Sequence, residues 1–322
     1  RQRQMCIRDS MGHRLVVALG GNALGNSPQE QLELIQGTAT ALVDLIEGGH
    51  EVIITHGNGP QVGMIKVATD NSAEKVGGTP EIPFPECSAM SQGYIGYHLQ
   101  QALENELHKR DIAKPVASLI TQTLVQADDP AFNNPNKPVG SFYSEEDAKR
   151  LMEETGETYV EDSGRGWRWV VASPQPTEIV EGEAITSLVN AGAVVISTGG
   201  GGIPVVRRDG GGFEGVPAVI DKDRSAAIMA DQVGASHLII LTAVANVAVN
   251  FNTPEQRDLT EITVDEAKQH MADGQFAPGS MLPKVEACVS YVDGGAGRTA
   301  IITSLENAGA VSYTHLTLPT KA

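Results

Sequence analysis

The spacing of apolar and polar residues along this chain predicts strands and helices in alternation. Four short apolar runs have the length of a buried strand, and each leads into a turn rich in glycine or charge. These runs are Arg14–Leu19, Glu51–Thr55, Ala193–Ser197 and Val216–Ile220. In an open parallel sheet, such turns meet at the carboxyl ends of the strands, where ligands bind. The turns are therefore the first candidates for a binding site.

A segment with helical spacing separates the first two runs. Ser27-Pro28-Gln29-Glu30 is a capping box with proline at the first helical position, and Gly48-Gly49 is a stop signal. Apolar residues recur between them at Leu32, Ile35, Ala39, Leu42, Leu45 and Ile46. A strand–helix–strand unit of this length makes its two strands parallel, with a right-handed connection.

The same alternation continues along the chain. Helical spacing predicts helices at 89–110, 181–191, 223–233, 264–272 and 283–292, and apolar runs predict further strands at 115–121, 238–241 and 299–303. The fold class is therefore α/β, with an open, mainly parallel sheet. We expect residues 12–125 and 177–311 to form one domain of this kind.

One segment, residues 126–176, breaks the alternation. It is polar and proline-rich, and Asn133–Pro138 is a cluster of turn residues. Ser144 and Gly156 are typical of the two ends of a short helix, and Trp167–Val171 has the character of a strand. We interpret the segment as an inserted subdomain that projects from the sheet as a lid, because long insertions in compact domains tend to be functional. The alternative is a loop excursion without a function.

The two ends of the chain do not continue the pattern. Met11 reads as a natural start after residues 1–10, and residues 312–322 follow Gly309-Ala310-Val311 without a recognisable periodicity. We expect both tails to be non-native cloning or assembly scars rather than native disordered ends.

Charge and cysteine content exclude several kinds of partner and site. The 322 residues carry a formal net charge of −17, so the chain repels nucleic acid and anionic membranes. The longest apolar run, Leu238–Val249, is too short to cross a bilayer. Cys6, Cys87 and Cys288 fit neither a metal pair nor a disulfide framework, which favours a reducing cytoplasm.

The glycine-rich turns favour a phosphate-bearing ligand. Glycine lets backbone N–H groups approach an anion closely, and successive N–H groups form a concave anion site. The turns follow neither the dinucleotide-binding pattern nor the phosphate-binding loop that ends in Gly-Lys-Ser/Thr. Each turn alone is as typical of a structural turn, but together they indicate a polyanion such as a nucleotide. The candidate phosphate-binding residues are Gly20, Gly21, Asn22, Gly57, Asn58, Gly59, Gly199 and Gly200.

Two lysines stand at the start of predicted helices. Lys222 lies between Asp221 and Asp223, and Lys284 lies in Ser280–Glu286. A lysine in a first turn opposes the helix dipole by a few tenths of a kcal/mol to about 1 kcal/mol, so its presence in an acidic chain indicates an anion site. The alternative is a pair of solvated surface lysines. Solvation is also the simpler interpretation of Lys137, at the tip of the insert.

The chain has anion sites and lysines but little acid–base machinery. His56 precedes a glycine turn and is more typical of a packed histidine than of a general base. No Ser/His/Asp set or zinc-ligand spacing is evident in the sequence. This combination favours phosphoryl transfer, in which catalysis consists mainly of positioning and neutralising charge.

Six motifs, taken in order, resemble those of the carbamate kinase family of bacteria, within the amino-acid kinase superfamily. They are Leu19–Leu24, His56–Gly63, Ala89–Tyr97, Gly199–Val205, Val219–Asp223 and Gly279–Ala287, and the resemblance spans residues 13–311. It implies a three-layer fold with the sheet between helices, and a homodimer. It also implies reversible phosphoryl transfer between ATP and carbamate, giving ADP and carbamoyl phosphate. The family often forms ATP in arginine or related nitrogen catabolism.

The resemblance also implies roles for matching residues. Lys222 would lie against the transferring phosphoryl group with Asp223 orienting it, and Lys284 would bind the nucleotide phosphates. Lys137 matches the lysine that the protruding subdomain of the family brings over the site. The glycine turns after the first two strands would hold carbamate and the transferring phosphate. Mg²⁺ would arrive with the nucleotide, so no metal site of the protein's own is expected.

Two departures from the family pattern and two alternative functions stay open at this stage. Ala245 stands where family members commonly have an acidic residue, in the nucleotide region, and the stretch after Val311 replaces the family's final short strand. A different acceptor, such as an amino-acid carboxylate or a phosphorylated metabolite, would make the chain another kinase of the superfamily. A regulator that binds nucleotide or carbamoyl phosphate without turnover is the second alternative.

Overall fold

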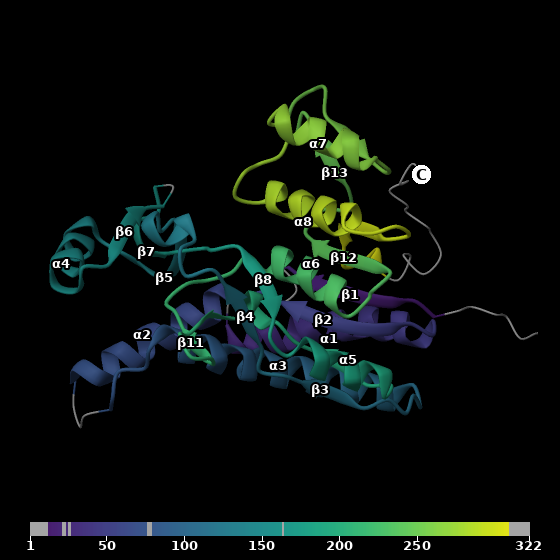
Figure 1. Ribbon diagram of the computed structural model, residues 1–322, viewed down its shortest axis with the longest axis horizontal. Coiled ribbons are helices and arrows are strands. Elements are labelled where there is room, and N and C mark those ends of the chain that lie inside the picture. The colour runs from purple at the N-terminus through teal and green to yellow at the C-terminus, as the bar shows by residue number, and fades with distance from the viewer. Residues whose placement is uncertain (1–11, 21–23, 25–26, 76–78, 163, 309–322) are drawn as a thin grey trace, which may run out of the picture.

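The computed structural model describes residues 12–20, 24, 27–75, 79–162 and 164–308, and its core is a parallel sheet (Figure 1). The strands lie in the order β15–β12–β1–β2–β9–β3, and each neighbouring pair runs parallel. Their bounds are β1 Arg14–Leu19, β2 Glu51–His56, β3 Val116–Ser118, β9 Val194–Ile196, β12 His237–Thr242 and β15 Thr299–Ser304. The predicted α/β class with a mainly parallel sheet is confirmed.

Side chains of the central strand β1 alternate between two apolar cores. Leu15, Val17 and Leu19 pack with helices α1 and α3 on one face of the sheet. Val16 and Ala18 pack with α5, α6 and α8 on the other face. The helix bounds are α1 Pro28–Glu47, α3 Phe84–Lys109, α5 Gly182–Asn190, α6 Lys222–Gln232 and α8 Met281–Asp293. The sheet is therefore the middle of three layers, because period-two alternation places apolar side chains on both of its faces.

Helix α1 shows how local sequence sets the ends of an element. Ser27 Oγ accepts a hydrogen bond from Glu30 N (3.2 Å), Pro28 lies in the first turn, and the helix ends before Gly48. Ile35 is fully buried, as its spacing predicts, whereas Leu32 near the N-terminus is 38% exposed. The helical spacing thus identifies the buried face except at the start of the helix.

A smaller mixed sheet lies beside the main one, in the order β11–β10–β4–β8. Its bounds are β4 Gln122–Val125, β8 Pro176–Ile179, β10 Ile203–Arg207 and β11 Phe213–Gly215. The strand predicted at 115–121 covers β3 and stops just before β4. Other elements outside these two sheets include two short helical turns, a pair of strands and a helix. Their bounds are η2 Pro130–Asn133, η3 Gly199–Gly201, β13 Val247–Val249, β14 Arg257–Leu259 and α7 Val264–Ala272.

The run Val216–Ile220 is not a strand of either sheet, so that prediction was wrong. Ala218 forms an isolated bridge with Ala172, and Val219 N donates to the Ala172 carbonyl (3.0 Å). Pro217 has no N–H to donate to a ladder. An apolar run between turns is equally typical of a buried extended segment that joins no sheet.

Helix α2 (Gly59–Lys75) was not predicted from the sequence. Its apolar residues do not gather on one face of the helix. The helix also begins with Gly59-Pro60, which reads as a turn signal in a sequence taken alone.

Residues 126–176, which we call the lid, contain a small sheet in the order β5–β7–β6 and project to the left of the main body in Figure 1. The bounds are β5 Lys137–Tyr143, α4 Glu145–Thr155, β6 Thr158–Glu161 and β7 Trp167–Val171. Ser144 Oγ accepts from Asp147 N (3.1 Å) at the start of α4, and Gly156 ends the helix with φ 73°. The lid meets the main body through an apolar cluster formed by Val62, Phe84, Cys87, Val139 and Val171.

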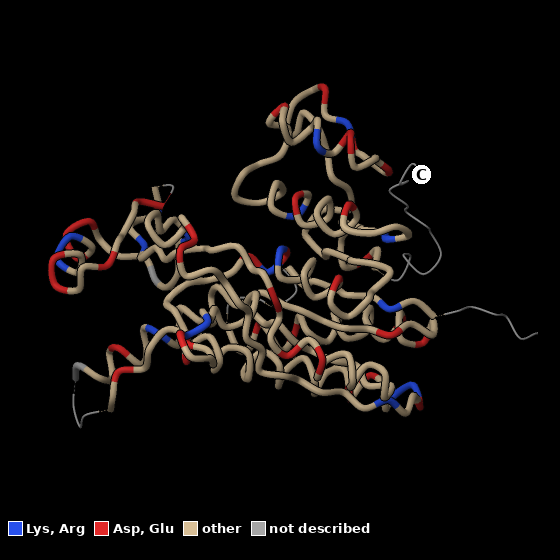
Figure 2. The backbone as a smooth tube through the Cα atoms, in the orientation of Figure 1, with Lys and Arg blue, Asp and Glu red and all other residues tan. Residues whose placement is uncertain are grey.

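Acidic residues are distributed over the main body and the lid alike, with lysine and arginine interspersed (Figure 2). Among the described residues, no helix is both long enough and apolar enough to cross a membrane.

Candidate active site

A cleft lies beyond the carboxyl ends of the parallel strands. Residues that follow β1, β2 and β12 line it, as does Gly200 in the η3 turn after β9. The candidates from the sequence that line it are Gly20, Gly57, Asn58, Gly59, Lys137, Gly200, Lys222, Asp223 and Lys284. The open parallel sheet thus brings together residues that lie far apart in the chain.

Three of the candidates are not seen in this lining. Gly21 and Asn22 lie outside the described residues. Gly199 is placed behind the lining, where a Cβ would lie 2.6 Å from the His56 ring and its carbonyl accepts from Gln92 Nε2 (3.0 Å). The structure therefore gives Gly199 a packing position rather than a place in the cleft.

Two glycines of the cleft, Gly20 and Gly200, stand where there is no room for a side chain. A Cβ on Gly20 would lie 2.7 Å from the Leu241 carbonyl oxygen, and a Cβ on Gly200 would collide with the Asn58 amide. Gly200 also has φ 68°. The Asn58 amide is itself fixed, because its Nδ2 donates to Ser91 Oγ (2.8 Å). A ligand beside these two glycines therefore meets peptide groups.

Helices α2, α6 and α8 begin at the cleft. The lining residues from their N-terminal turns are Gly59 and Val62 of α2, Lys222 and Asp223 of α6, and Pro283 and Lys284 of α8. A helix N-terminus carries about half a positive charge. Convergence of several N-termini on one cavity is typical of an anion-binding site.

Aspartates hold the lysines of the cleft in place. Lys284 Nζ donates to Asp223 Oδ2 (2.8 Å), and Lys222 Nζ contacts Asp223 Oδ1. Lys137 Nζ donates to Asp221 Oδ2 (3.3 Å), so the lid reaches the start of α6. Asp221 also caps that helix by accepting from Asp223 N (3.0 Å). Within the described lining, lysines exceed aspartates by one, so the cleft is locally positive in an acidic chain.

Asp223 is ionised between two ammonium groups. Burial alone raises the pKa of its carboxyl, but Lys222 and Lys284 outweigh burial and hold that pKa below its usual value. Burial lowers the pKa of Lys222, with Asp223 opposing this change and Lys284 reinforcing it. One carboxylate cannot neutralise two ammonium groups, so the arrangement favours an additional anion.

His56, the last residue of β2, has a structural role. It is 1% exposed, and its Nδ1 lies 2.8 Å from the Gly57 carbonyl oxygen, so the proton belongs on Nδ1. Burial lowers the pKa of His56 to about 4, against the opposing effect of that hydrogen bond. The ring is neutral near pH 7, in agreement with its interpretation as a packed histidine.

We expect His56 to make the protein less stable as the pH falls from 6.5 towards 4. The unfolded chain protonates His56 near pH 6.5, whereas the folded protein does so only near pH 4, so unfolding takes up a proton in this range. The shift corresponds to about 3 kcal/mol of unfolding free energy at the acid end. Urea unfolding at several pH values measures it, and His56→Asn should flatten the dependence. An equally steep dependence in His56→Asn would contradict this assignment.

Sequence reasoning missed several lining residues. Thr242 ends β12 and Ala243 follows it, Gly279 and Ser280 precede α8, and Asp221 caps α6. The Asp-Lys-Asp motif was a usable signal for Asp221, and the end of the predicted strand at 238–241 was one for Thr242. Nothing local distinguishes Gly279 from an ordinary turn glycine.

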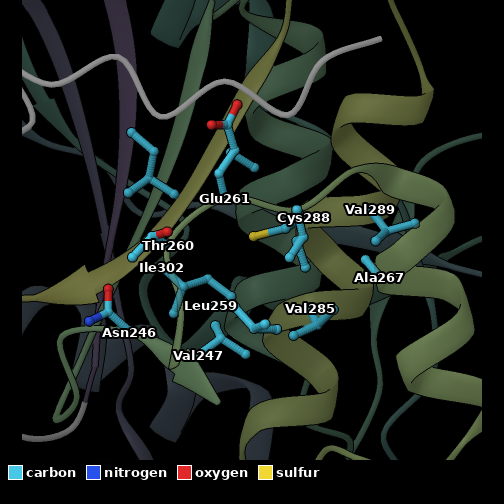
Figure 3. A pocket seen from close by; sticks show the side chains of 13 residues that line it. Asn246, Val247, Leu259, Thr260, Glu261, Ala267, Val285, Cys288, Val289 and Ile302 are labelled. Atoms are coloured by element: carbon cyan, nitrogen blue, oxygen red, sulfur yellow. The ribbon is translucent and has the colours of Figure 1, made fainter. Parts of the chain in front are cut away.

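A second, apolar cavity lies beside α8 (Figure 3). Val285, Cys288 and Val289 of that helix line it together with Val247 and Ile302. The Cys288 sulfur points into this cavity in Figure 3, and burial raises the pKa of its thiol. The thiol therefore stays protonated and is a poor nucleophile.

Ala245, where the sequence departs from the family pattern, is exposed and lies outside the described lining of the cleft. Its carbonyl accepts from Thr303 Oγ1 (3.2 Å). In the part of the chain that the structure describes, no cluster of three or more His, Cys, Asp or Glu side chains could hold a metal ion.

Comparisons with known proteins agree on one family for most of the chain. The model of the amino acid kinase family matches residues 13–304. The chain is 56% identical to a carbamate kinase of Staphylococcus haemolyticus over 92% of this chain and 95% of that protein. It is 53% identical, with the same coverage, to carbamate kinase 3 of Staphylococcus aureus. Among solved structures it is similar to carbamate kinase from Giardia lamblia bound to AMP-PNP, with a TM-score of 0.86 and 41% identity over 92% of this chain and 94% of that one.

Proposed function

This chain belongs to the amino acid kinase family, and we propose that it is a carbamate kinase. It transfers a phosphoryl group reversibly between ATP and carbamate, giving ADP and carbamoyl phosphate. The observation that carries this proposal is the cleft in which lysines, helix N-termini and glycine backbone meet at the ends of parallel strands. Identity above 50% to curated carbamate kinases over nearly the whole chain supports the same reaction.

The proposed phosphoryl transfer needs no general base, which agrees with the scarcity of acid–base groups in the cleft. A carbamate oxygen attacks the γ-phosphorus, a new P–O bond forms, and the bond to the β–γ bridging oxygen breaks as ADP leaves. Carbamate is already an anion, so no general base is required. The main obstacle is repulsion between carbamate and the triphosphate, which positive groups reduce. A cleft with lysines and peptide N–H groups is suited to that task.

Lys222, Lys284 and Asp223 each have a role in this proposal. Lys222 neutralises charge on the transferring phosphoryl group, and Lys284 binds the nucleotide phosphates. Asp223 orients both ammonium groups, since each of them contacts it. Gly20, Gly21, Asn22 and the Gly57–Gly59 turn would hold carbamate and phosphate through their backbone. Mg²⁺ is expected as part of the nucleotide substrate, because magnesium commonly keeps its waters and is bound through substrate phosphates.

Lys137 would bring a further positive charge from the lid. Its ammonium lies at the cleft already, 3.3 Å from Asp221 Oδ2, and its side chain is 43% exposed. That contact leaves it free to exchange the aspartate for a phosphate oxygen when a nucleotide binds. We propose that residues 126–176 act as a lid in this sense.

Three further properties follow from the resemblance and belong to the same proposal. The chain would act in the cytoplasm, form ATP in arginine or related nitrogen catabolism, and assemble as a homodimer. An exposed apolar pair on one face of α3, Met90 and Tyr97, at 49% and 59% exposure, supports association with another copy. Sedimentation analysis would test the dimer.

The deciding experiment measures ATP formed from ADP, Mg²⁺ and carbamoyl phosphate, with acetyl phosphate as the control donor. We expect enzyme-dependent ATP with a strong preference for carbamoyl phosphate. A folded sample that makes no ATP would favour another acceptor or a binding-only regulator. Binding of ADP without turnover would single out the regulator.

A further inference from the structure

The lid rests on α2 at a point where two glycines meet. A Cβ built on Gly63 of α2 would lie 2.5 Å from Gly140 Cα and 2.6 Å from Gly140 N, in β5. Gly63 is buried in the structure. The two backbones therefore touch directly, and no side chain fits between them.

Gly140 is fixed from the lid side. It has φ 73°, and the pairing of β5 with β7 is irregular between Val139 and Tyr143. Arg168 Nη2 donates to the Gly140 carbonyl (3.1 Å), and the Arg168 guanidinium stacks over the Phe142 ring at 5.1 Å. The bend that lowers β5 onto α2 is therefore held by β7.

This crossing lies close in sequence to residues that line the cleft, on β5 as well as on α2. Lys137 precedes Gly140 by three residues on β5, and Gly63 follows Gly59 by four residues on α2. Val139 and Val62, which lie between these points, line the cleft and also belong to the apolar cluster under the lid. The separation of α2 and β5 at the glycines thus sets the height of Lys137 over the cleft.

We propose that Gly63 is a positioning residue: its missing side chain lets β5 approach α2 closely enough to place the Lys137 ammonium in the cleft. The proposal rests on the proposed kinase function. An alanine methyl at Gly63 needs about 3.4 Å or more from its neighbours, so β5 would move outwards by roughly 1 Å. A misplacement of about 1 Å can cost on the order of 10²-fold in rate.

The test compares Gly63→Ala with Gly37→Ala. Gly37 is a helical glycine of α1 at which a Cβ meets nothing within 4 Å, so that control should keep its activity. We expect Gly63→Ala to lower kcat by about 10- to 100-fold and to leave KM for ADP nearly unchanged. In a Lys137→Met background the same substitution should cost little more, because the lysine that it displaces is already absent.

Tryptophan fluorescence gives a readout that does not depend on activity. The chain has two tryptophans, and both Trp167 and Trp169 lie in β7 of the lid. Trp169 packs edge-to-face on Phe84 of the main body, with ring centroids 5.1 Å apart. Displacement of β5 should therefore shift the emission of Gly63→Ala to longer wavelength and leave that of Gly37→Ala unchanged.

The outcomes separate the positioning role of Gly63 from the proposed reaction. Unchanged emission in Gly63→Ala, or equal losses of kcat with and without Lys137, would overturn the proposal. Altered emission supports it even where the unmodified protein makes no ATP from carbamoyl phosphate, a result that counts against the proposed reaction alone. Should Gly63→Ala fail to fold, Arg168→Met tests the same crossing. It removes the hydrogen bond to Gly140 without adding bulk, and it should lower kcat only when Lys137 is present.

Discussion

Replacement of Lys222 by alanine should lower kcat by on the order of 10³-fold while nucleotide affinity falls by less than about tenfold. The Lys222 ammonium is buried at the start of α6, with a side chain 15% exposed, and it faces the glycine turn after β2. Charge on the phosphoryl group and its partners is redistributed in the transition state, and a fixed, buried ammonium stabilises that distribution most. In Lys222→Ala, Lys284 and the helix N-termini are still present to bind the nucleotide phosphates.

Steady-state kinetics and calorimetric ADP binding on the same preparations separate these two effects. Lys109→Ala is the matched control, because it removes a lysine that is 75% exposed at the end of α3 and pairs there with Glu106. Its activity should match that of the unmodified protein. Equal losses of kcat and ADP affinity in Lys222→Ala would rule out the role given to Lys222 and leave it as a binding residue.

Asp223→Asn should destabilise the protein by about 3–5 kcal/mol and also abolish most activity. The carboxylate is 3% exposed and contacts both Lys222 and Lys284. Without its charge, two buried ammonium groups face each other and have lost the carboxylate that contacts both of them. The contribution of Asp223 to stability is present above the usual carboxyl pKa. It is lost only as the pH falls through the lowered pKa of the folded protein.

Chemical unfolding near pH 7 measures this loss, with Asp231→Asn as the control. Asp231 lies in the same helix, is 58% exposed and pairs with Arg298, so its removal should cost less than about 1 kcal/mol. Adding Lys284→Met to Asp223→Asn should restore part of the stability, since one ammonium then remains. A stability of Asp223→Asn equal to that of the unmodified protein would show that the lysines do not depend on this carboxylate.

Elements with side-chain signals at both ends could be predicted closely from the sequence. Helix α7 spans the residues predicted for it, and Thr263 and Glu266 form a capping box at its start. Helix α4 begins after Ser144 and ends at Gly156, as its sequence indicates. Caps and left-handed glycines act over a few residues, so the information is local.

Contacts between distant segments could not be predicted in this way. Lys137 meets Asp221 across 84 residues of sequence, and nothing around Lys137 distinguishes it from a solvated lysine. The family resemblance, rather than the pattern, indicated its place. The mistaken strand at 216–220 has the same origin, because hydrogen bonding between distant segments decides whether an apolar run joins a sheet.

The convergence of α2, α6 and α8 makes part of the cleft's attraction for anions a property of the backbone. Peptide dipoles have no pKa and cannot be removed by substituting a side chain. The field they create is therefore constant over the whole pH range in which the protein is folded. Loss of one lysine should therefore change which step of the reaction is rate-limiting. It should have a smaller effect on whether a polyphosphate enters the cleft. The fold itself thus protects substrate capture from mutation, whereas the transfer step depends on individual side chains.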